Sequence, residues 1–187
     1  MNQEQWNVCR SDGAAGPVAE NLRKNIETIK QSGQRLATLV DGILDITEMQ
    51  NQKVRIEPKP VSLRDLADEV LTVMRSAANL KKILLLSDIP ANLPAALADK
   101  DRLAQILYNL IGNAIKFTES GSVTLKAAVT PQGIRIGVKD TGIGIAPENH
   151  SRIFNSFEQL EGANTRHYGG LGLGLTVCKQ LVNLHGS

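Results

Sequence analysis

The stretch that decides the fold is residues 109–118, which read NLIGNAIKFT. At about 100° per residue of a helix, Asn109, Asn113 and Lys116 fall within about 60° of one another. The neighbouring arc holds apolar residues, namely Leu103, Ile106, Leu107, Leu110, Ile111 and Ala114. The spacing therefore predicts a helix over 99–117 that carries two amides and an ammonium beside its apolar face.

This polar stripe has two interpretations. It is either an ordinary solvated helix face or a ligand-binding surface. Asparagine gains little in the middle of a helix unless its side chain has something to bind. Amide oxygens are hard ligands that suit Mg²⁺, and a lysine ammonium is a point charge suited to phosphate. The stripe alone leaves both interpretations open.

Two glycine-containing segments follow this helix. Residues 140–145, DTGIGI, come directly after the second strand of a hairpin that we expect from the alternating stretches 123–129 and 134–139. Residues 169–175, GGLGLGL, lead straight into a helix expected over 174–184. Spaced glycines let the backbone approach a ligand, and a helix N-terminus attracts anions. Taken singly, the first segment is also consistent with an ordinary turn and the second with a flexible linker.

Upstream of these segments, the pattern predicts a domain boundary, a helix and a strand. Ser62 is placed to cap a helix that runs to about Leu80, and residues 83–87 form a strand. Helices and an antiparallel hairpin on one sheet predict an α+β, two-layer sandwich. Pro58 and Pro60 mark the expected boundary, which divides the chain into 1–57 and 58–187.

The first of these domains contains a sustained heptad. Its positions, at alternating spacings of four and three residues, are Leu22, Ile26, Ile29, Gly33, Leu36, Val40, Ile43 and Thr47. The narrow apolar seam favours a bundle or coiled-coil helix over a surface helix packed on its own domain. A single helix cannot bury such a seam, so a partner helix is implied.

Composition excludes several classes of protein. The chain has 187 residues, 42% hydrophobic and 21% charged, with a formal net charge of +2. A disordered chain would be poorer in apolar residues, and no apolar run approaches the roughly 18 residues of a membrane span. The charge gives no reason to expect nucleic acid or an anionic membrane as a partner. Cys9 and Cys178 are too few for a disulfide framework or a metal knuckle. A reducing, cytoplasmic setting is therefore expected.

Together and in order, four segments resemble the conserved boxes of sensor histidine kinases. They are the N box (109–118), the first glycine box (140–145), the F box (152–159, RIFNSFEQ) and the second glycine box (170–175). The resemblance covers residues 61–187 and implies the Bergerat-type ATPase fold, a mixed sheet covered by helices. The heptad helix is similar to the second helix of the family's dimerisation and phosphotransfer domain.

The resemblance also implies ligands and roles. The cofactors are ATP and Mg²⁺, with Asn113 as the main metal ligand, Asn109 assisting beside the phosphates and Lys116 meeting them. Asp140 accepts a hydrogen bond from the adenine amino group. The other residues expected to line the nucleotide site are Thr141, Gly142, Gly144, Ile145, Phe157, Arg166, Gly170, Leu171, Gly172, Leu173 and Gly174. Phe154 and Phe157 would anchor a lid that runs from Glu158 to about Gly169.

The chain departs from the family pattern in three ways. No histidine precedes the heptad helix, so the phosphoacceptor is missing; His150, His167 and His185 are expected to be surface or lid residues. The last two strands of the family's sheet are also missing. Leu171 stands where the family commonly has Thr or Ser. A piece of a longer sensor kinase, which is a homodimer, accounts for these departures.

Three functions remain to be weighed. The first is a kinase that binds Mg·ATP and phosphorylates a histidine on a helical domain outside this chain, with a response regulator downstream. The alternative is a nucleotide-binding or docking module without kinase activity. A third is a hydrolysing relative, but such members carry Glu where this chain has Asn109, and an amide is not a general base. The expected location is the cytoplasm, either alone or as the cytoplasmic part of a membrane-bound sensor.

Overall fold

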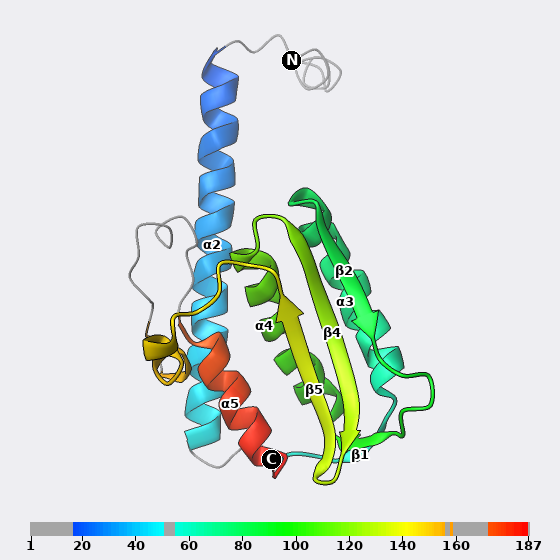
Figure 1. Ribbon diagram of the computed structural model, residues 1–187. Helices are drawn as coiled ribbons and strands as arrows, with labels where there is room; N and C mark the ends of the chain where they lie inside the picture. The colour runs from blue at the N-terminus through cyan, green and yellow to red at the C-terminus, as the bar shows by residue number, and fades with distance from the viewer. Residues whose placement is uncertain (1–16, 51–54, 156–157, 159–171, 187) are drawn as a thin grey trace, which may run out of the picture. The chain divides into compact units, whose positions relative to one another are not determined.

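The computed structural model describes residues 17–50, 55–155, 158 and 172–186 (Figure 1). The chain divides into two compact units, Met1–Leu44 and Asp45–Ser187. This division falls inside the first helix, earlier than the boundary expected at Pro58, which stays a prediction. The two units are described separately.

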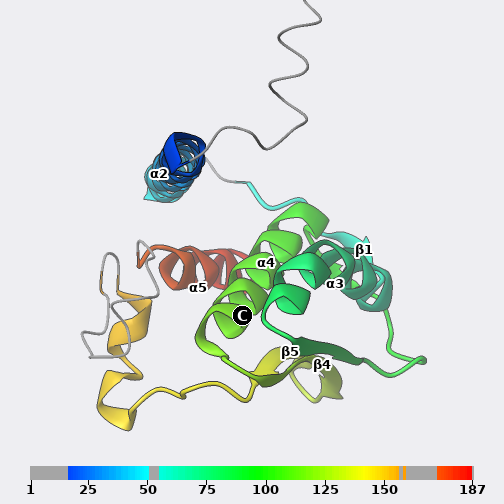
Figure 2. The same cartoon turned by 90° about the horizontal axis from the view of Figure 1, so that it is seen from above.

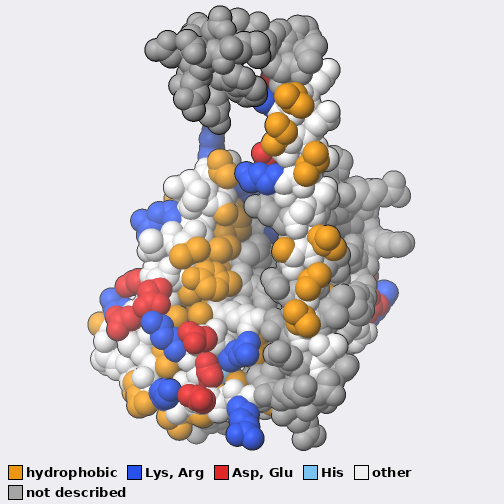
Figure 3. All heavy atoms as spheres, turned by 180° about the vertical axis from the view of Figure 1, so that it is seen from behind, with side chains coloured by type: hydrophobic (Ala, Val, Ile, Leu, Met, Phe, Trp, Pro, Cys, Tyr) orange, Lys and Arg blue, Asp and Glu red, His pale blue; other side chains and the backbone are white. Residues whose placement is uncertain are grey.

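Helix α2 spans Pro17–Gln50 and contains the whole heptad. Proline is tolerated in its first turn because the N–H group there has no partner within a helix. The heptad side chains that can be described are 48% to 71% exposed: Leu22, Ile26, Ile29, Leu36 and Val40. Figure 3 shows hydrophobic side chains following one another along this helix. The long helix with an apolar seam is confirmed, and its partner helix stays a prediction.

The second unit is built on a mixed three-stranded sheet with the order β2-β4-β5. Strand β2 (Ile83–Asp88) is parallel to β4 (Gly121–Thr130), and β4 is antiparallel to β5 (Gly133–Asp140). The hairpin closes with Thr130 opposite Gly133, as the sequence predicts. Because β2 and β4 are parallel, the chain has to cross over between them, and it does so through a helix.

A second, two-stranded sheet was not expected from the sequence. It pairs β1 (Lys59–Val61) with β3 (Ala96–Ala98) in antiparallel fashion. Each strand has three residues, which is too short for a recognisable alternation, and Pro60 sits in the first of them. Pro60 therefore does not prevent strand pairing, and helix α2 already ends at Gln50, before both prolines.

Three helices lie on one face of the three-stranded sheet (Figure 2). They are α3 (Leu63–Leu80), α4 (Lys100–Phe117) and α5 (Gly174–Leu184), and two short 3-10 helices, η1 (Pro147–Asn149) and η2 (Arg152–Phe154), precede α5. The core between the layers includes Leu66, Ile111, Leu125 and Leu181, each almost fully buried. The α+β sandwich with a mixed sheet is therefore confirmed.

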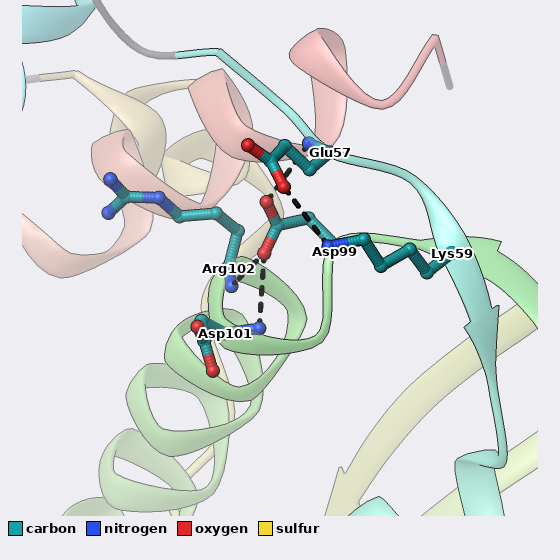
Figure 4. Close-up of polar contacts among 5 residues, drawn as sticks. All are labelled: Glu57, Lys59, Asp99, Asp101 and Arg102. Carbon is teal, nitrogen blue, oxygen red and sulfur yellow. Dashed lines mark hydrogen bonds and ion pairs between the residues drawn. The ribbon is translucent and has the colours of Figure 1, made fainter.

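Asp99 connects distant segments of the chain at the start of α4, and Figure 4 shows its bonds to Glu57, Asp101 and Arg102. Its Oδ1 accepts from the N–H groups of Asp101 and Arg102, each at 3.1 Å, and its Oδ2 accepts from Glu57 N–H at 3.1 Å. Its own N–H donates to Nε2 of His185 at 3.1 Å. Asp99 is thus the N-cap of α4 and not, as expected, its first residue.

His185 is not the surface residue that the sequence suggests. It is half-buried just after α5, and Nδ1 donates to the Leu181 carbonyl at 2.8 Å while Nε2 accepts from Asp99. Because a carbonyl only accepts and an amide N–H only donates, the ring is the neutral Nδ1–H tautomer. The end of α5 is thereby tied to the beginning of α4.

The Asp99 carboxyl has a depressed pKa that makes its contribution to stability dependent on pH. Burial raises the pKa, but the N–H groups of Glu57, Arg102 and Asp101 outweigh this effect and lower it below the usual value. Replacing a carboxylate N-cap by alanine typically costs about 1–2 kcal/mol of stability. A carboxyl with a lowered folded pKa contributes this stability above its unfolded pKa and loses it as the pH falls.

We therefore expect Asp99→Ala to lower the free energy of unfolding at pH 7 by about 1–2 kcal/mol. Below about pH 4 the carboxyl is protonated first in the unfolded chain, because its folded pKa is lower, so the difference from wild type should shrink progressively. Urea unfolding followed by circular dichroism at pH 7 and pH 3 measures both values. Asp68→Ala, which alters an exposed carboxylate of α3, is the control. A difference that is the same at both pH values would contradict the role of the charged cap.

Candidate functional site

The polar stripe of α4 lies beside the buried face of that helix. Asn109, Asn113 and Lys116 are each half-buried, whereas Ile106 and Ile111 on the neighbouring arc are buried. Burial lowers the pKa of Lys116 from its ordinary value, and its Nζ lies 4.6 Å from the centroid of the Phe117 ring. The stripe is therefore not an ordinary solvated helix face.

The first glycine segment is joined to the end of α4. Asp140 ends β5, and its Oδ1 accepts from Gly142 N–H at 2.8 Å. The next N–H, of Ile143, donates to the Phe117 carbonyl at 3.2 Å. A Cβ on Gly142 would overlap the Phe117 carbonyl oxygen and come within 2.9 Å of Asp140 Oδ1, so only glycine fits there. Residues 109–118 and 140–145 thus form one continuous surface.

The Thr141 side chain has a structural role that the sequence did not indicate. Its Oγ1 accepts from Ser122 N–H at 3.0 Å and lies within 3.4 Å of the Ser120 and Ser122 carbonyls. Gly121 has a φ of +114°, and a Cβ there would overlap Thr141 Oγ1. The hydroxyl, together with the Thr141 N–H that donates to the Ser122 carbonyl at 3.1 Å, therefore ties the end of β5 to the start of β4.

The remainder of this loop carries exposed apolar side chains. Ile143 and Ile145 are exposed, and the Ile145 carbonyl accepts from Nε2 of His150 at 3.0 Å. Gly144 has a φ of +70°, in the region that favours glycine. The expected lining residues Gly142, Gly144 and Ile145 therefore follow Asp140 in a loop that is held at both ends.

The second glycine segment meets the polar stripe at Asn109. Leu173 is the buried N-cap of α5, and its apolar side chain makes no capping hydrogen bond. A Cβ on Gly174 would lie 3.2 Å from Asn109 Oδ1 and 3.5 Å from Asn109 Cγ. Gly172, with a φ of +68°, precedes this contact. The structure thus places the beginning of α5, where N–H groups are unpaired, against the amide of Asn109.

The F-box segment packs on the first turns of α5. Thr176 Oγ1 donates to the Phe154 carbonyl at 3.1 Å, and Lys179 Nζ lies 5.8 Å from the Phe154 ring centroid. Glu158 accepts from Asn155 Nδ2 at 2.7 Å and from Arg152 Nε at 2.6 Å. Both bonds lower the pKa of the Glu158 carboxyl. The beginning of the expected lid is therefore fixed to η2.

Four of the expected site residues lie outside the described residues: Phe157, Arg166, Gly170 and Leu171. The same holds for most of the expected lid, 159–169. Their roles stay predictions.

Sequence reasoning missed two residues that support the polar stripe, Lys81 and Cys178. Lys81 Nζ donates to the carbonyls of Ile115 at 2.9 Å, Lys116 at 2.6 Å and Thr118 at 3.3 Å, and so caps the end of α4. Cys178 is buried on α5 against α4. Both contacts join segments that are far apart in the chain, so no local sequence pattern predicts them.

The arrangement offers three kinds of group to a ligand at one end of the sheet. Asp140 supplies a carboxylate acceptor, α4 supplies two amides and an ammonium, and α5 supplies the N–H groups of a helix start. This set is suited to a base that donates and to phosphates that accept. Within the described part of the chain, no helix combines the length and apolar character that a membrane span requires.

Comparison with known proteins identifies the domain. The sequence model of the family described as "Histidine kinase-, DNA gyrase B-, and HSP90-like ATPase" matches residues 98–187. The circadian input-output histidine kinase CikA of Synechococcus elongatus is 40% identical over 176 residues, which are 92% of this chain and 23% of CikA. The chain thus spans less than a quarter of that relative.

Two solved structures are similar in fold as well as in sequence. Full-length ShkA in complex with AMPPNP has a TM-score of 0.77 and 35% identity, covering 88% of this chain and 34% of ShkA. The histidine kinase ThkA in complex with the response regulator TrrA has a TM-score of 0.67 and 25% identity, covering 95% of this chain and 48% of ThkA. Residues 98–187 belong to the family of histidine kinase-, DNA gyrase B- and HSP90-like ATPases, and most of the chain is similar in sequence and fold to parts of histidine kinases.

Proposed function

We propose that this chain binds Mg·ATP and transfers the γ-phosphoryl group to a histidine on a helical domain outside residues 1–187. The observation that carries the proposal is the meeting of three motif segments. Ile143 N–H bonds the Phe117 carbonyl, and Gly174 lies against the Asn109 amide. The acceptor, the amides and the helix start therefore lie on segments that contact one another. This supports phosphoryl transfer, which depends on positioning and on neutralising charge.

Each group has a distinct part in this proposal. The Asp140 oxygen that does not bond Gly142 accepts from the adenine amino group. Asn113 and Asn109 offer amide oxygens that fit Mg²⁺, an ion that takes few protein ligands and shares phosphate oxygens. When bound, the ion neutralises phosphate charge. Lys116 would have to leave the Phe117 ring to reach a phosphate oxygen, and the negative charge there would oppose the lowering of its pKa by burial.

The amide at position 109 favours transfer over hydrolysis. In the reaction, a lone pair of a neutral imidazole nitrogen forms a bond to the γ-phosphorus, and the bond from that phosphorus to the β,γ-bridging oxygen breaks. ADP leaves with the electron pair. A neutral imidazole already has an unprotonated nitrogen at pH 7, so no base has to remove a proton from the attacking atom. The proton on the other ring nitrogen passes to solvent from the phosphorylated ring. Water would need such a base, and an amide does not supply one.

Phosphotransfer to a separate acceptor tests the proposal directly. The chain is mixed with [γ-³²P]ATP, Mg²⁺ and a panel of separately produced dimerisation domains of sensor histidine kinases, each with its phosphoacceptor histidine. We expect an acid-labile, alkali-stable label on the acceptor, and none on acceptors whose histidine is replaced by glutamine. If the chain binds ATP in calorimetry but labels none of the acceptor domains, the result would favour the docking module. Hydrolysis well above background that is lost in Asn109→Ala would favour a hydrolysing enzyme.

The metal assignment makes a separate prediction. We expect Asn113→Ala to weaken binding of AMPPNP about tenfold in the presence of Mg²⁺, because the metal loses one of its few protein ligands. Binding of ADP in EDTA should change little, since no metal is present there. Calorimetric titrations of the wild type and of Asn113→Ala under both conditions measure the difference. An equal loss with and without Mg²⁺ would contradict a metal-binding role for Asn113.

A further inference from the structure

Lys81 lies in the turn between α3 and β2, and its side chain reaches the end of α4, 34 to 37 residues further along the chain. Its Nζ donates to the carbonyls of Ile115 at 2.9 Å, Lys116 at 2.6 Å and Thr118 at 3.3 Å. An ammonium has three N–H groups, so each of them can serve one of these acceptors. The half-buried positive charge also lies at the negative end of the α4 dipole, where it is stabilising.

The last four carbonyls of α4, those of residues 114–117, are divided among three donors. The first accepts from Thr118 N–H at 3.0 Å, and Lys81 serves the second and the third. The fourth, that of Phe117, accepts from Ile143 N–H at 3.2 Å. A helix leaves these carbonyls without partners in its own turns, so their positions depend on outside donors. Lys81 therefore fixes the two carbonyls that precede the one bound by Ile143.

The bond between Phe117 and Ile143 links the two halves of the candidate site. In the proposed function, the groups that meet the phosphates lie on α4, and Lys116 is in its last turn. The group that meets adenine is the carboxylate of Asp140, three residues before Ile143. One nucleotide has to fit both halves at once, so a loosened last turn would let the distance between them vary and would weaken the fit.

We propose that Lys81 is a positioning residue for nucleotide binding, which holds the last turn of α4 against the 140–145 loop. The inference rests on the proposed function, since that function places a nucleotide across these two segments. A site that is already ordered binds more tightly than one that its ligand has to order, because the loss of freedom precedes binding. Lys81 acts from outside the site, as its ammonium is occupied by backbone carbonyls.

Hydrogen exchange of the full chain without nucleotide tests the contact. The chain is labelled with ¹⁵N-isoleucine, and the Ile143 amide signal is identified by its loss in Ile143→Val. Exchange of Ile111, which is buried in the middle of α4, reports the loss of global stability. We expect Lys81→Met to speed exchange of Ile143 about tenfold or more beyond any change at Ile111. Lys82→Met, which removes the neighbouring exposed charge, should match the wild type at both amides.

Nucleotide affinity tests the consequence. We expect Lys81→Met to weaken Mg·AMPPNP binding about five- to tenfold in calorimetry, the effect of one hydrogen bond. Lys81→Arg, which keeps a cation with several N–H donors, should recover most of this loss. Lys82→Met should bind within about twofold of wild type, which separates positioning from a general attraction of positive charge to phosphate. Ser62→Ala, which removes the cap at the other end of α3, should lose stability and keep its affinity.

The two proposals fail in different ways. Wild-type affinity in Lys81→Met, or unchanged exchange of Ile143, would overturn the positioning role while the proposed function stands. The same conclusion would follow from a loss in Lys82→Met or Ser62→Ala as large as that in Lys81→Met, or from no recovery in Lys81→Arg. A folded wild-type chain that does not bind Mg·AMPPNP would overturn the proposed function together with this role.

Discussion

The Asp140→Asn variant is expected to keep its fold and to lose ATP affinity by about 100-fold or more. The fold is kept because an amide oxygen can still accept from Gly142 N–H, as Oδ1 does at 2.8 Å. The other side-chain oxygen of residue 140, however, is replaced by an NH₂ group, which cannot accept a hydrogen bond from the adenine amino group. Two donors then face each other, which adds the cost of an unsatisfied donor, about 1–3 kcal/mol, to the lost bond.

Titration with a nucleotide that lacks the amino group isolates this effect. Purine riboside triphosphate has no exocyclic amine, so wild type and Asp140→Asn should bind it with similar affinity. Both titrations are made by calorimetry in Mg²⁺, and urea unfolding shows that the variant is folded. Equal ATP affinity in the two proteins would mean that Asp140 does not recognise adenine. The site assignment would then be wrong.

The Gly142→Ala variant should have the second largest effect, because it introduces a carbon where the backbone leaves no room. The added Cβ would overlap the Phe117 carbonyl oxygen and crowd Asp140 Oδ1 at 2.9 Å. Neither group is the end of a flexible side chain that can move aside, since Oδ1 is held by the Gly142 N–H. We expect the loop to shift, ATP affinity to fall at least about tenfold, and stability to fall by about 1–3 kcal/mol.

Gly137→Ala is the matched control. Gly137 lies on β5 three residues before Asp140, and a Cβ there would meet nothing within 4 Å. This variant should unfold and bind nucleotide like the wild type. If Gly142→Ala also behaved like the wild type in urea unfolding and calorimetry, the close approach of residues 117 and 142 would be contradicted.

The sequence predicts most of the fold because most of its helices and strands have a recognisable local pattern of residues. Ser62 marks the beginning of α3, and its side chain accepts from Asp65 N–H at 3.4 Å, as expected. The helical period ends α4 at Phe117, and alternation identifies the hairpin of β4 and β5. The strands β1 and β3 were missed because three residues do not establish a period.

The candidate site was only partly accessible to the same reasoning. Motif order brings 109–118, 140–145 and 170–175 together by resemblance, and the structure shows contacts between the described parts of these segments. Motif order could not show that the Thr141 hydroxyl belongs to the strand junction at Gly121, or that the Cys178 thiol donates to the Ile106 carbonyl. Such contacts depend on how distant segments pack, and a pattern of residue types along the chain carries no information on them.

The interpretation also changes for His185. In the sequence it is one of three histidines without a motif, and a surface position was the natural expectation. In the structure it accepts from Asp99 N–H at 3.1 Å, next to the bond from Glu57 to the same residue. The end of α5 and the residues before β1 therefore meet at the start of α4. The helix whose N-terminus faces Asn109 is thus anchored at its other end.

The central claim is that residues of α4, the 140–145 loop and the start of α5 form one nucleotide site. Calorimetric titration of the chain with AMPPNP, with and without Mg²⁺, tests it most directly. We predict saturable binding at one site per chain that is tighter with Mg²⁺ than in EDTA. A chain that unfolds cooperatively in urea and yet gives no saturable binding under either condition would contradict the account.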